Sequence, residues 1–138
     1  MSYVAFSWKK MYKVASDLGY ELKRRGPFNH AVTILRGGLV PTRLLMNADV
    51  VPECIHLVSV KFLPGYTSVY CSDMEEISDD DKVLIIDDII DSGRTFKNVM
   101  NALPGKKTYC ALVSKQKHID ALYGVYVPED RWVIFPWE

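Results

Sequence analysis

Two neighbouring carboxylates, Asp87 and Asp88, directly follow four apolar residues at positions 83–86. An apolar run of this kind, bounded by polar residues, is typical of a strand buried on both faces in a parallel sheet. We therefore expect the carboxylates to stand where that strand ends. Adjacent carboxylates repel a phosphate, but they suit sugar hydroxyls or a divalent cation. Taken alone, the pair is equally compatible with an acidic helix cap that binds no ligand.

The next residues form a turn with the opposite preference, for an anion. It consists of Asp91, Ser92, Gly93, Arg94 and Thr95. Its backbone N–H groups and two hydroxyls can cradle a phosphate, and its glycine lets the backbone approach closely. A helical pattern follows, with apolar residues at Phe96, Val99, Met100 and Leu103. Because helix N-termini attract phosphate, the whole stretch predicts a ligand with a phosphate beside a sugar diol.

A second turn of this kind, Arg36-Gly37-Gly38, separates a predicted strand at 31–35 from a helix that begins near Pro41. Two glycines allow backbone amides to point outward, and Arg36 adds a fixed positive charge. The segment predicts another anion site at the end of a strand. A tight structural turn without a ligand is the alternative.

The stretch at 83–95 resembles the signature of type I phosphoribosyltransferases, in which hydrophobic residues lead into Asp-Asp and a five-residue loop that ends in Thr. The resemblance implies that Asp87 and Asp88 hold the ribose hydroxyls of phosphoribosyl pyrophosphate and a Mg²⁺ ion. It also implies that Asp91–Thr95 bind the 5′-phosphate. Asp91 is, by the same resemblance, the general base that takes the proton from N7 of a purine.

The turn at Arg36–Gly38 resembles the pyrophosphate-binding loop of purine phosphoribosyltransferases, most closely the bacterial xanthine-guanine branch. In that family the peptide that enters the loop is often cis, which makes the Leu35–Arg36 bond a candidate. The resemblance also covers Lys115, which follows a predicted strand at 108–114. The 6-oxopurine enzymes place a lysine there to donate to O6 of the base.

The C-terminal segment at 130–138 is unusually aromatic for a chain end, which argues against fraying. Composition alone favours packing in the core over a platform on which a planar base stacks. The segment also resembles the C-terminal part of xanthine-guanine phosphoribosyltransferases. That resemblance implies that Trp132 covers the purine ring and that main-chain groups at Val133 read position 2 of the base.

The composition describes one globular domain. The chain has 138 residues, of which 49% are hydrophobic and 25% charged, and this length suits a single core. Lys plus Arg equals Asp plus Glu, at 17 each, so the balance gives no reason to expect nucleic-acid or membrane binding. Three widely spaced cysteines argue against a disulfide framework or a zinc site, and Cys110 is expected in the core. We expect a cytoplasmic protein, because neither a signal-peptide pattern nor a long apolar stretch is present.

The rest of the chain is expected to form the strands, helix and loop that position these residues. We expect an edge strand at 3–6, an N-cap at Ser7, and a helix over 8–25 whose basic residues form either a solvated face or an anion-binding patch. A strand is expected at 55–61, with His56 as an ordinary strand histidine like His30 and His118. The stretch at about 62–80 lacks a clear period and is predicted to be a flexible loop that closes over the reaction centre.

Together these features predict an α/β fold with a mostly parallel central sheet flanked by helices, and a small hood made of residues 1–7 and 115–138. The predicted reaction transfers ribose 5-phosphate from phosphoribosyl pyrophosphate to N9 of guanine, xanthine or hypoxanthine, in a homo-oligomer that uses Mg²⁺. One alternative is a related regulator that binds nucleotide and RNA and catalyses little, supported by the basic helix. Another is transfer to a pyrimidine or adenine, which Lys115 and Trp132 oppose.

Overall fold

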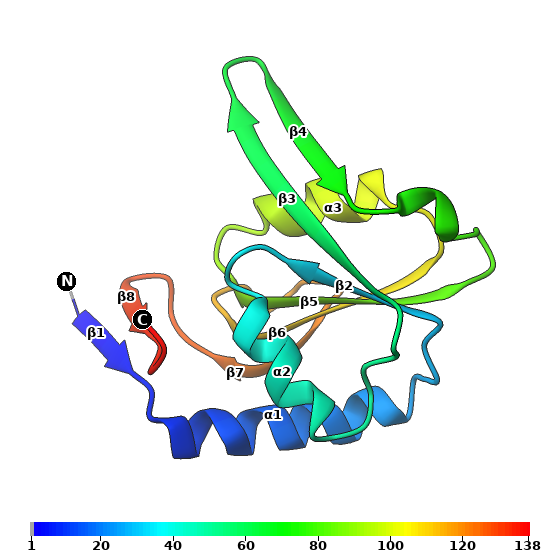
Figure 1. Cartoon of the computed structure of the whole chain (residues 1–138). Coiled ribbons are helices and arrows are strands. Elements are labelled where there is room, and N and C mark those ends of the chain that lie inside the picture. The colour runs from blue at the N-terminus through cyan, green and yellow to red at the C-terminus, as the bar shows by residue number, and fades with distance from the viewer. Residues whose placement is uncertain (1) are drawn as a thin grey trace.

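A six-stranded, mostly parallel sheet forms the centre of the molecule, and helices cover both of its faces (Figure 1). The computed structural model describes residues 2–138. The strand order across the sheet is β4-β3-β2-β5-β6-β7, and the β3–β4 pair is antiparallel. The strands are β2 (His30–Ile34), β3 (Ile55–Leu63), β4 (Tyr66–Cys71), β5 (Lys82–Ile90), β6 (Lys106–Ser114) and β7 (Leu122–Tyr126). The predicted fold class is confirmed.

The central strand β5 has its apolar run buried on both faces, as the sequence predicted. Leu84 and Ile86 pack into the core on the side of α1 (Trp8–Lys23) and α2 (Leu39–Met46). Val83 and Ile85 pack on the opposite side, against α3 (Arg94–Ala102). This alternation follows from the two-residue period of a strand, and it decides where the carboxylates that follow will point.

Helix α1 begins as predicted, because Ser7 Oγ accepts a hydrogen bond from the N–H of Lys10 at 3.0 Å. Its apolar face, which includes Met11, Leu18 and Leu22, is buried against the sheet and α2. The helix ends at Lys23, and the cis Gly26-Pro27 peptide follows it. No helix within residues 2–138 is both long enough and apolar enough to cross a membrane.

The two chain ends meet in a small hood beside the sheet (Figure 1). There β1 (Ser2–Ala5) pairs in parallel with β8 (Arg131–Ile134), so that Tyr3 lies opposite Trp132 and Val4 opposite Val133. Phe135 is 3% exposed, and its ring stacks on Trp137 at 4.6 Å between centroids. The segment is therefore packed rather than frayed, and it carries Trp132 into a fixed position.

Three details of the prediction were wrong. The segment predicted as a loop at about 62–80 contains the end of β3, all of β4 and a 3₁₀ turn (Met74–Glu76), and the β3–β4 hairpin projects away from the sheet (Figure 1). Strand β5 continues past the acidic pair to Ile90, because β6 pairs with it as far as Ser114. Strand β7 was not predicted, since its sequence Leu-Tyr-Gly-Val-Tyr has no strict alternation.

Candidate active site

Asp87 and Asp88 lie in the second half of β5, just beyond Ile86, the last residue of β5 that pairs with β2. Consecutive residues in a strand point to opposite faces, so the two carboxylates have different surroundings. Asp87 is 6% exposed on the α3 side, whereas Asp88 is half-buried on the side of α2. Asp88 Oδ1 accepts a hydrogen bond from the N–H of Ile89 at 2.8 Å. The adjacent pair therefore consists of one enclosed and one accessible acid.

The surroundings of Asp87 hold its proton firmly. Burial, and then the adjacent charge of Asp88, raise the pKa of Asp87 to about 8. The hydroxyl of Tyr109 donates to Asp87 Oδ2 at 2.8 Å and partly opposes that rise. Tyr109 lies opposite Ile85, on the face that Asp87 shares, so the register between β5 and β6 brings the two side chains together.

Paired carboxylates fit a divalent metal ion. Carboxylate oxygens are the ligands that Mg²⁺ prefers in proteins, usually one or two of them with water and substrate phosphate. Burial is the main cause of the raised pKa of Asp87, and the adjacent charge of Asp88 adds to it, so a cation beside the pair would favour the ionised form of Asp87. Asp88 is the accessible carboxylate of the pair and Asp87 the enclosed one.

The turn at 91–95, the predicted anion site, leads directly into the start of α3. Gly93 has a φ of +87°, in the left-handed region, and precedes the first helical residue. Ser92 Oγ accepts from the N–H of Arg94 at 3.3 Å, which shapes the turn. These residues line a cavity of about 310 Å³ together with Asp87 and Asp88. The predicted phosphate turn and acidic pair therefore share one hollow.

The second glycine turn lies against the acidic pair. A Cβ atom on Gly37 would stand 2.5 Å from the carboxyl group of Asp88, and one on Gly38 would stand 2.5 Å from the carbonyl oxygen of Ile86. Both positions thus require glycine for close approach. The peptide between Leu35 and Arg36 is cis, as the resemblance suggested. The expectation of outward amides is wrong for Gly38, because its N–H donates to the carbonyl oxygen of Ile34 at 2.7 Å.

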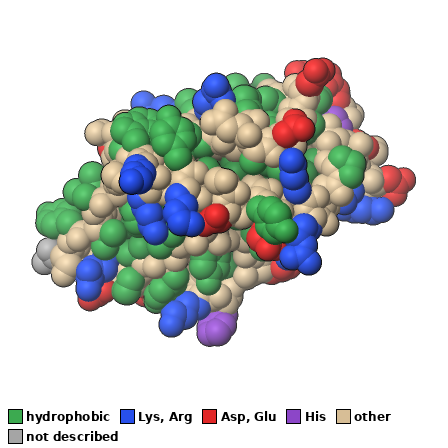
Figure 2. Space-filling model, turned by 90° about the horizontal axis from the view of Figure 1, so that it is seen from below, with side chains coloured by type: hydrophobic (Ala, Val, Ile, Leu, Met, Phe, Trp, Pro, Cys, Tyr) green, Lys and Arg blue, Asp and Glu red, His purple; other side chains and the backbone are tan. Residues whose placement is uncertain are grey.

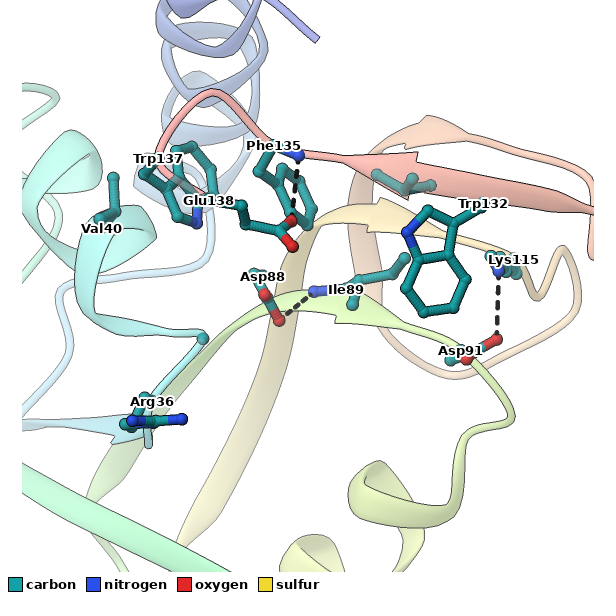
Figure 3. A pocket seen from close by; sticks show the side chains of 12 residues that line it. Arg36, Val40, Asp88, Ile89, Asp91, Lys115, Trp132, Phe135, Trp137 and Glu138 are labelled. Atoms are coloured by element: carbon teal, nitrogen blue, oxygen red, sulfur yellow. Dashed lines mark hydrogen bonds and ion pairs between the residues drawn. The ribbon is translucent and has the colours of Figure 1, made fainter. Parts of the chain in front are cut away.

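A larger cavity of about 470 Å³ lies on the other side of Asp88, beneath the hood (Figure 3). Lys115, Asp91 and Arg36 supply charged groups to its wall, and Trp132 and Val133 supply apolar ones. Lys115 and Asp91 point toward one another beside the Trp132 ring (Figure 3), with Nζ and Oδ1 3.6 Å apart. The predicted base-binding residues are thus brought together.

The two cavities adjoin at the end of β5. Gly37, Asp88, Ile89 and Asp91 line both of them. Ile89 was not singled out in the sequence, and neither was Glu138, whose carboxylate accepts from the N–H of Phe135 at 3.0 Å inside the larger cavity. A bipartite ligand could therefore place a phosphate in one hollow and a planar ring in the other.

A pair of side chains connects the projecting hairpin to the start of α3. The guanidinium carbon of Arg94 lies 4.1 Å from the centre of the Phe62 ring, which is a cation–π contact. Phe62 belongs to β3, and Arg94 is the first residue of α3. No sequence signal linked these two residues, since they lie 32 positions apart.

Comparisons with known proteins agree with this geometry. A model of the phosphoribosyl transferase domain matches residues 7–116. The chain belongs to the phosphoribosyltransferase family. The matched range contains both glycine turns, the acidic pair and Lys115, whereas Trp132 and the rest of the hood lie beyond it.

Individual relatives extend this family likeness over the whole chain. A xanthine-guanine phosphoribosyltransferase from Gluconobacter oxydans is 31% identical over 99% of this chain and 84% of its own length. A purine phosphoribosyltransferase from Pyrococcus horikoshii superposes with a TM-score of 0.77 at 24% identity, over 100% of this chain and 95% of that one. A xanthine-guanine-hypoxanthine phosphoribosyltransferase from Helicobacter pylori gives 0.77 at 22% identity, over 99% and 93%. The structural matches show a shared fold.

The side of the molecule that carries α1 would have to be strongly positive if the alternative of RNA binding were correct. Figure 2 looks onto the side where α1 lies in Figure 1, and shows a few adjoining Lys and Arg side chains next to an acidic one, with the others scattered among hydrophobic and acidic groups. Lys13 pairs with Asp17 at 2.9 Å, and Arg24 pairs with Glu21 at 3.6 Å. These exposed pairs reduce the local positive charge, which favours a solvated helix face over an extended anion-binding surface.

Proposed function

We propose that this protein transfers ribose 5-phosphate from phosphoribosyl pyrophosphate to N9 of a 6-oxopurine and releases pyrophosphate. The observation that carries the proposal is the pair of adjoining cavities, one with an anion turn and one with a buried lysine beside an exposed tryptophan. The xanthine-guanine and xanthine-guanine-hypoxanthine phosphoribosyltransferases among its relatives support a 6-oxopurine as the substrate.

Each part of the site would hold one part of the substrates. The turn at Asp91–Thr95 would bind the 5′-phosphate through backbone N–H groups at the start of α3. Arg36 and Gly37 would bind pyrophosphate, while Gly38 would keep the turn close to β5. Asp88, and Asp87 behind it, would hold the ribose hydroxyls together with Mg²⁺. The metal, when bound, would stabilise charge on the departing pyrophosphate.

The larger cavity would select the base. Lys115 is 8% exposed, so its ammonium group is enclosed and would donate to an oxo group at position 6. An amino group at that position would meet an unfavourable donor–donor contact. Trp132 would cover one face of the ring, and the main chain at Val133 would contact position 2.

Asp91 lies between the two reacting partners. Its side chain is 72% exposed, and it borders both cavities. In the proposed reaction the bond from the ribose C1 to the pyrophosphate oxygen breaks, and a bond from C1 to N9 forms. The purine then loses its N7 proton, which Asp91 would accept. Most of the rate would come from positioning and from stabilising charge.

The test is pyrophosphate release in the presence of Mg²⁺ and phosphoribosyl pyrophosphate, with guanine, xanthine, hypoxanthine, adenine and uracil offered in parallel. We expect release with the oxopurines, loss of release when Mg²⁺ is chelated, and loss in Asp91→Ala. Asp79→Ala, which changes an exposed acid outside both cavities, is the matched control.

Two outcomes would overturn the proposal. Release with adenine or uracil but not with oxopurines would assign a different base. Binding of phosphoribosyl pyrophosphate without release for any base would favour the regulatory alternative, and a filter-binding assay with RNA would then test that function directly. Homo-oligomerisation and cytoplasmic location stay predictions that these assays do not require.

A further inference from the structure

A cluster of three side chains of the types that bind metal ions lies at the opposite ends of the strands from the cavities. His30 is the first residue of β2, Cys54 immediately precedes β3, and His56 is the second residue of β3. One ligand atom from each lies within 4.8 Å of the other two. Because β2, β3 and β5 run parallel, the N-terminal ends of these strands lie on the same side of the sheet, where the cluster is found. The candidate active site lies at their C-terminal ends.

The spacing of these atoms matches the edges of a tetrahedral coordination shell. His30 Nδ1 lies 3.0 Å from His56 Nε2, and Cys54 Sγ lies 3.5 Å from the same nitrogen. With zinc bonds of about 2.0–2.1 Å to nitrogen and about 2.3 Å to sulfur, tetrahedral angles separate two nitrogens by about 3.3 Å and nitrogen from sulfur by about 3.6 Å. An ion would therefore fit with small side-chain adjustments.

The outer nitrogens of the two rings show why a positive ion suits the centre. His56 Nδ1 lies 2.7 Å from the carbonyl oxygen of Ser72, which can only accept, so this nitrogen carries the hydrogen. His30 Nε2 lies 3.0 Å from the carboxylate of Asp81 and donates to it for the same reason. In neutral imidazoles both inner nitrogens then present lone pairs to one another at 3.0 Å. A proton or a metal ion between them would remove that repulsion.

The hydrogen bonds of the two outer ring nitrogens are also those that metal-binding histidines make in proteins. A ligating histidine ordinarily donates its other N–H to a carboxylate or a backbone carbonyl, which fixes the ring and its tautomer. Both histidines do so here, and both are enclosed, at 9% and 2% exposure. Cys54 is half-buried, and its sulfur lies 4.0 Å from Glu76 Oε2.

We propose that His30, Cys54 and His56 bind a transition-metal ion of the zinc class, with Glu76 or a water as the fourth ligand. Imidazole and thiolate are ligands for Zn²⁺ and its neighbours, and not for the hard Mg²⁺ ion that suits the acidic pair. The ion links the N-terminal end of β2 to the N-terminal end of β3. Through Asp81 and Ser72 it also fastens them to the segments next to β5 and β4, so its role is structural.

The experiment uses the full chain without a histidine tag, reduced and freed of metal, and titrates it with Co²⁺ as a coloured substitute for Zn²⁺. We expect one equivalent to bind and to give the thiolate-to-cobalt charge-transfer absorption and the intense visible bands of tetrahedral coordination. Added Zn²⁺ should displace Co²⁺, and the Tm should rise with free zinc. Absence of binding at micromolar Co²⁺ and Zn²⁺ would overturn the proposal in favour of a proton shared between the rings.

Variants locate the ion. Cys54→Ser should abolish the charge-transfer band and weaken zinc binding by more than about 100-fold, which exceeds the loss typical of an outer contact. Asp81→Asn keeps every ligand but replaces the charged acceptor of His30 with a neutral amide oxygen, and should weaken binding by about 10- to 100-fold. Cys71→Ala and His118→Asn, outside the cluster, are the matched controls. A band that persists in Cys54→Ser, or is lost in Cys71→Ala, would place the ion elsewhere and overturn the proposal.

Discussion

The ammonium group of Lys115 lies 3.6 Å from the carboxylate of Asp91, and this ion pair joins the end of β6 to the turn that follows β5. The lysine side chain is 8% exposed, whereas the aspartate side chain is 72% exposed. The cation is therefore held by its surroundings, while the carboxylate is free to turn. A ligand in the larger cavity would meet a fixed donor and an adjustable acceptor side by side.

Replacing Lys115 with alanine should reduce discrimination between oxo and amino groups at position 6. A hydrogen bond to a charged group contributes about 1.5–3 kcal/mol, so kcat/KM for the preferred oxopurine should fall about 10- to 150-fold. The value for adenine should stay the same or rise. Lys117→Ala is the control, because Lys117 lies over the ring of Tyr126 and does not line the cavity. An unchanged ratio of oxopurine to adenine would contradict the assigned role.

Trp132→Ala should weaken base binding with little effect on stability. The side chain is 52% exposed, so its removal leaves no large cavity in the core. Stacking of a base on an aromatic ring contributes about 1–3 kcal/mol, which corresponds to a rise in the KM for the base of about 5- to 150-fold. Steady-state kinetics measure this, with Tyr20→Ala as a control at an exposed aromatic residue of α1. Equal effects of both variants would exclude stacking at Trp132.

Asp87→Asn should change how stability depends on pH. Well below pH 4, Asp87 is protonated in the folded and unfolded chain alike. Between about pH 4 and 8 the unfolded chain has released this proton, while the folded protein, in which the pKa of Asp87 is raised to about 8, retains it. The free energy of unfolding of the wild type therefore falls through this window as the pH rises.

Asparagine at position 87 cannot ionise, so the free energy of unfolding of the variant does not fall for this reason as the pH rises. Its advantage in urea denaturation at matched pH should grow from about pH 4 to about pH 8 and then level off. Asp120→Asn, at an exposed position, should track the wild type at every pH. A constant difference between Asp87→Asn and the wild type would show that Asp87 keeps an ordinary pKa in the folded protein.

Gly37→Ala should disable the pyrophosphate turn. The new methyl group would stand 2.5 Å from the Asp88 carboxyl carbon, so that carboxylate or the turn must move. Calorimetric titration with phosphoribosyl pyrophosphate and Mg²⁺ should show binding weakened at least about tenfold, for a stability cost of about 1–3 kcal/mol. Gly26→Ala, whose methyl group would make ordinary contacts at 3.5 Å, should bind normally.

Phe62→Leu should loosen the hairpin without unfolding it. The contact between Arg94 and the Phe62 ring joins β3 to the start of α3, and such contacts at exposed sites contribute about 0.5–1 kcal/mol. Hydrogen exchange of the β4 amides should therefore become about two- to fivefold faster. Tyr66→Leu, near the hairpin tip, is the control. Equal exchange in both variants would mean that the contact does not restrain the hairpin.

The sequence alone predicted the parts of the site that depend on local patterns. The apolar run before Asp87, the glycine turn at Arg36–Gly38 and the Ser7 cap are each contained within a few residues, so periodicity and turn chemistry revealed them. The β3–β4 hairpin was missed, because its pairing depends on contacts between strands and its sequence shows no clean alternation.

Tertiary structure decided which side chains face one another. Alternation along β5 separated Asp87, enclosed beside Tyr109, from the accessible Asp88, although the two are adjacent in sequence. Parallel pairing brought His30 to His56 across 26 positions, which no spacing rule in the sequence indicated. Local patterns are fixed by short-range sterics and hydrogen bonding. Distant contacts depend on strand order and register, which the chain acquires only when its core is buried as a whole.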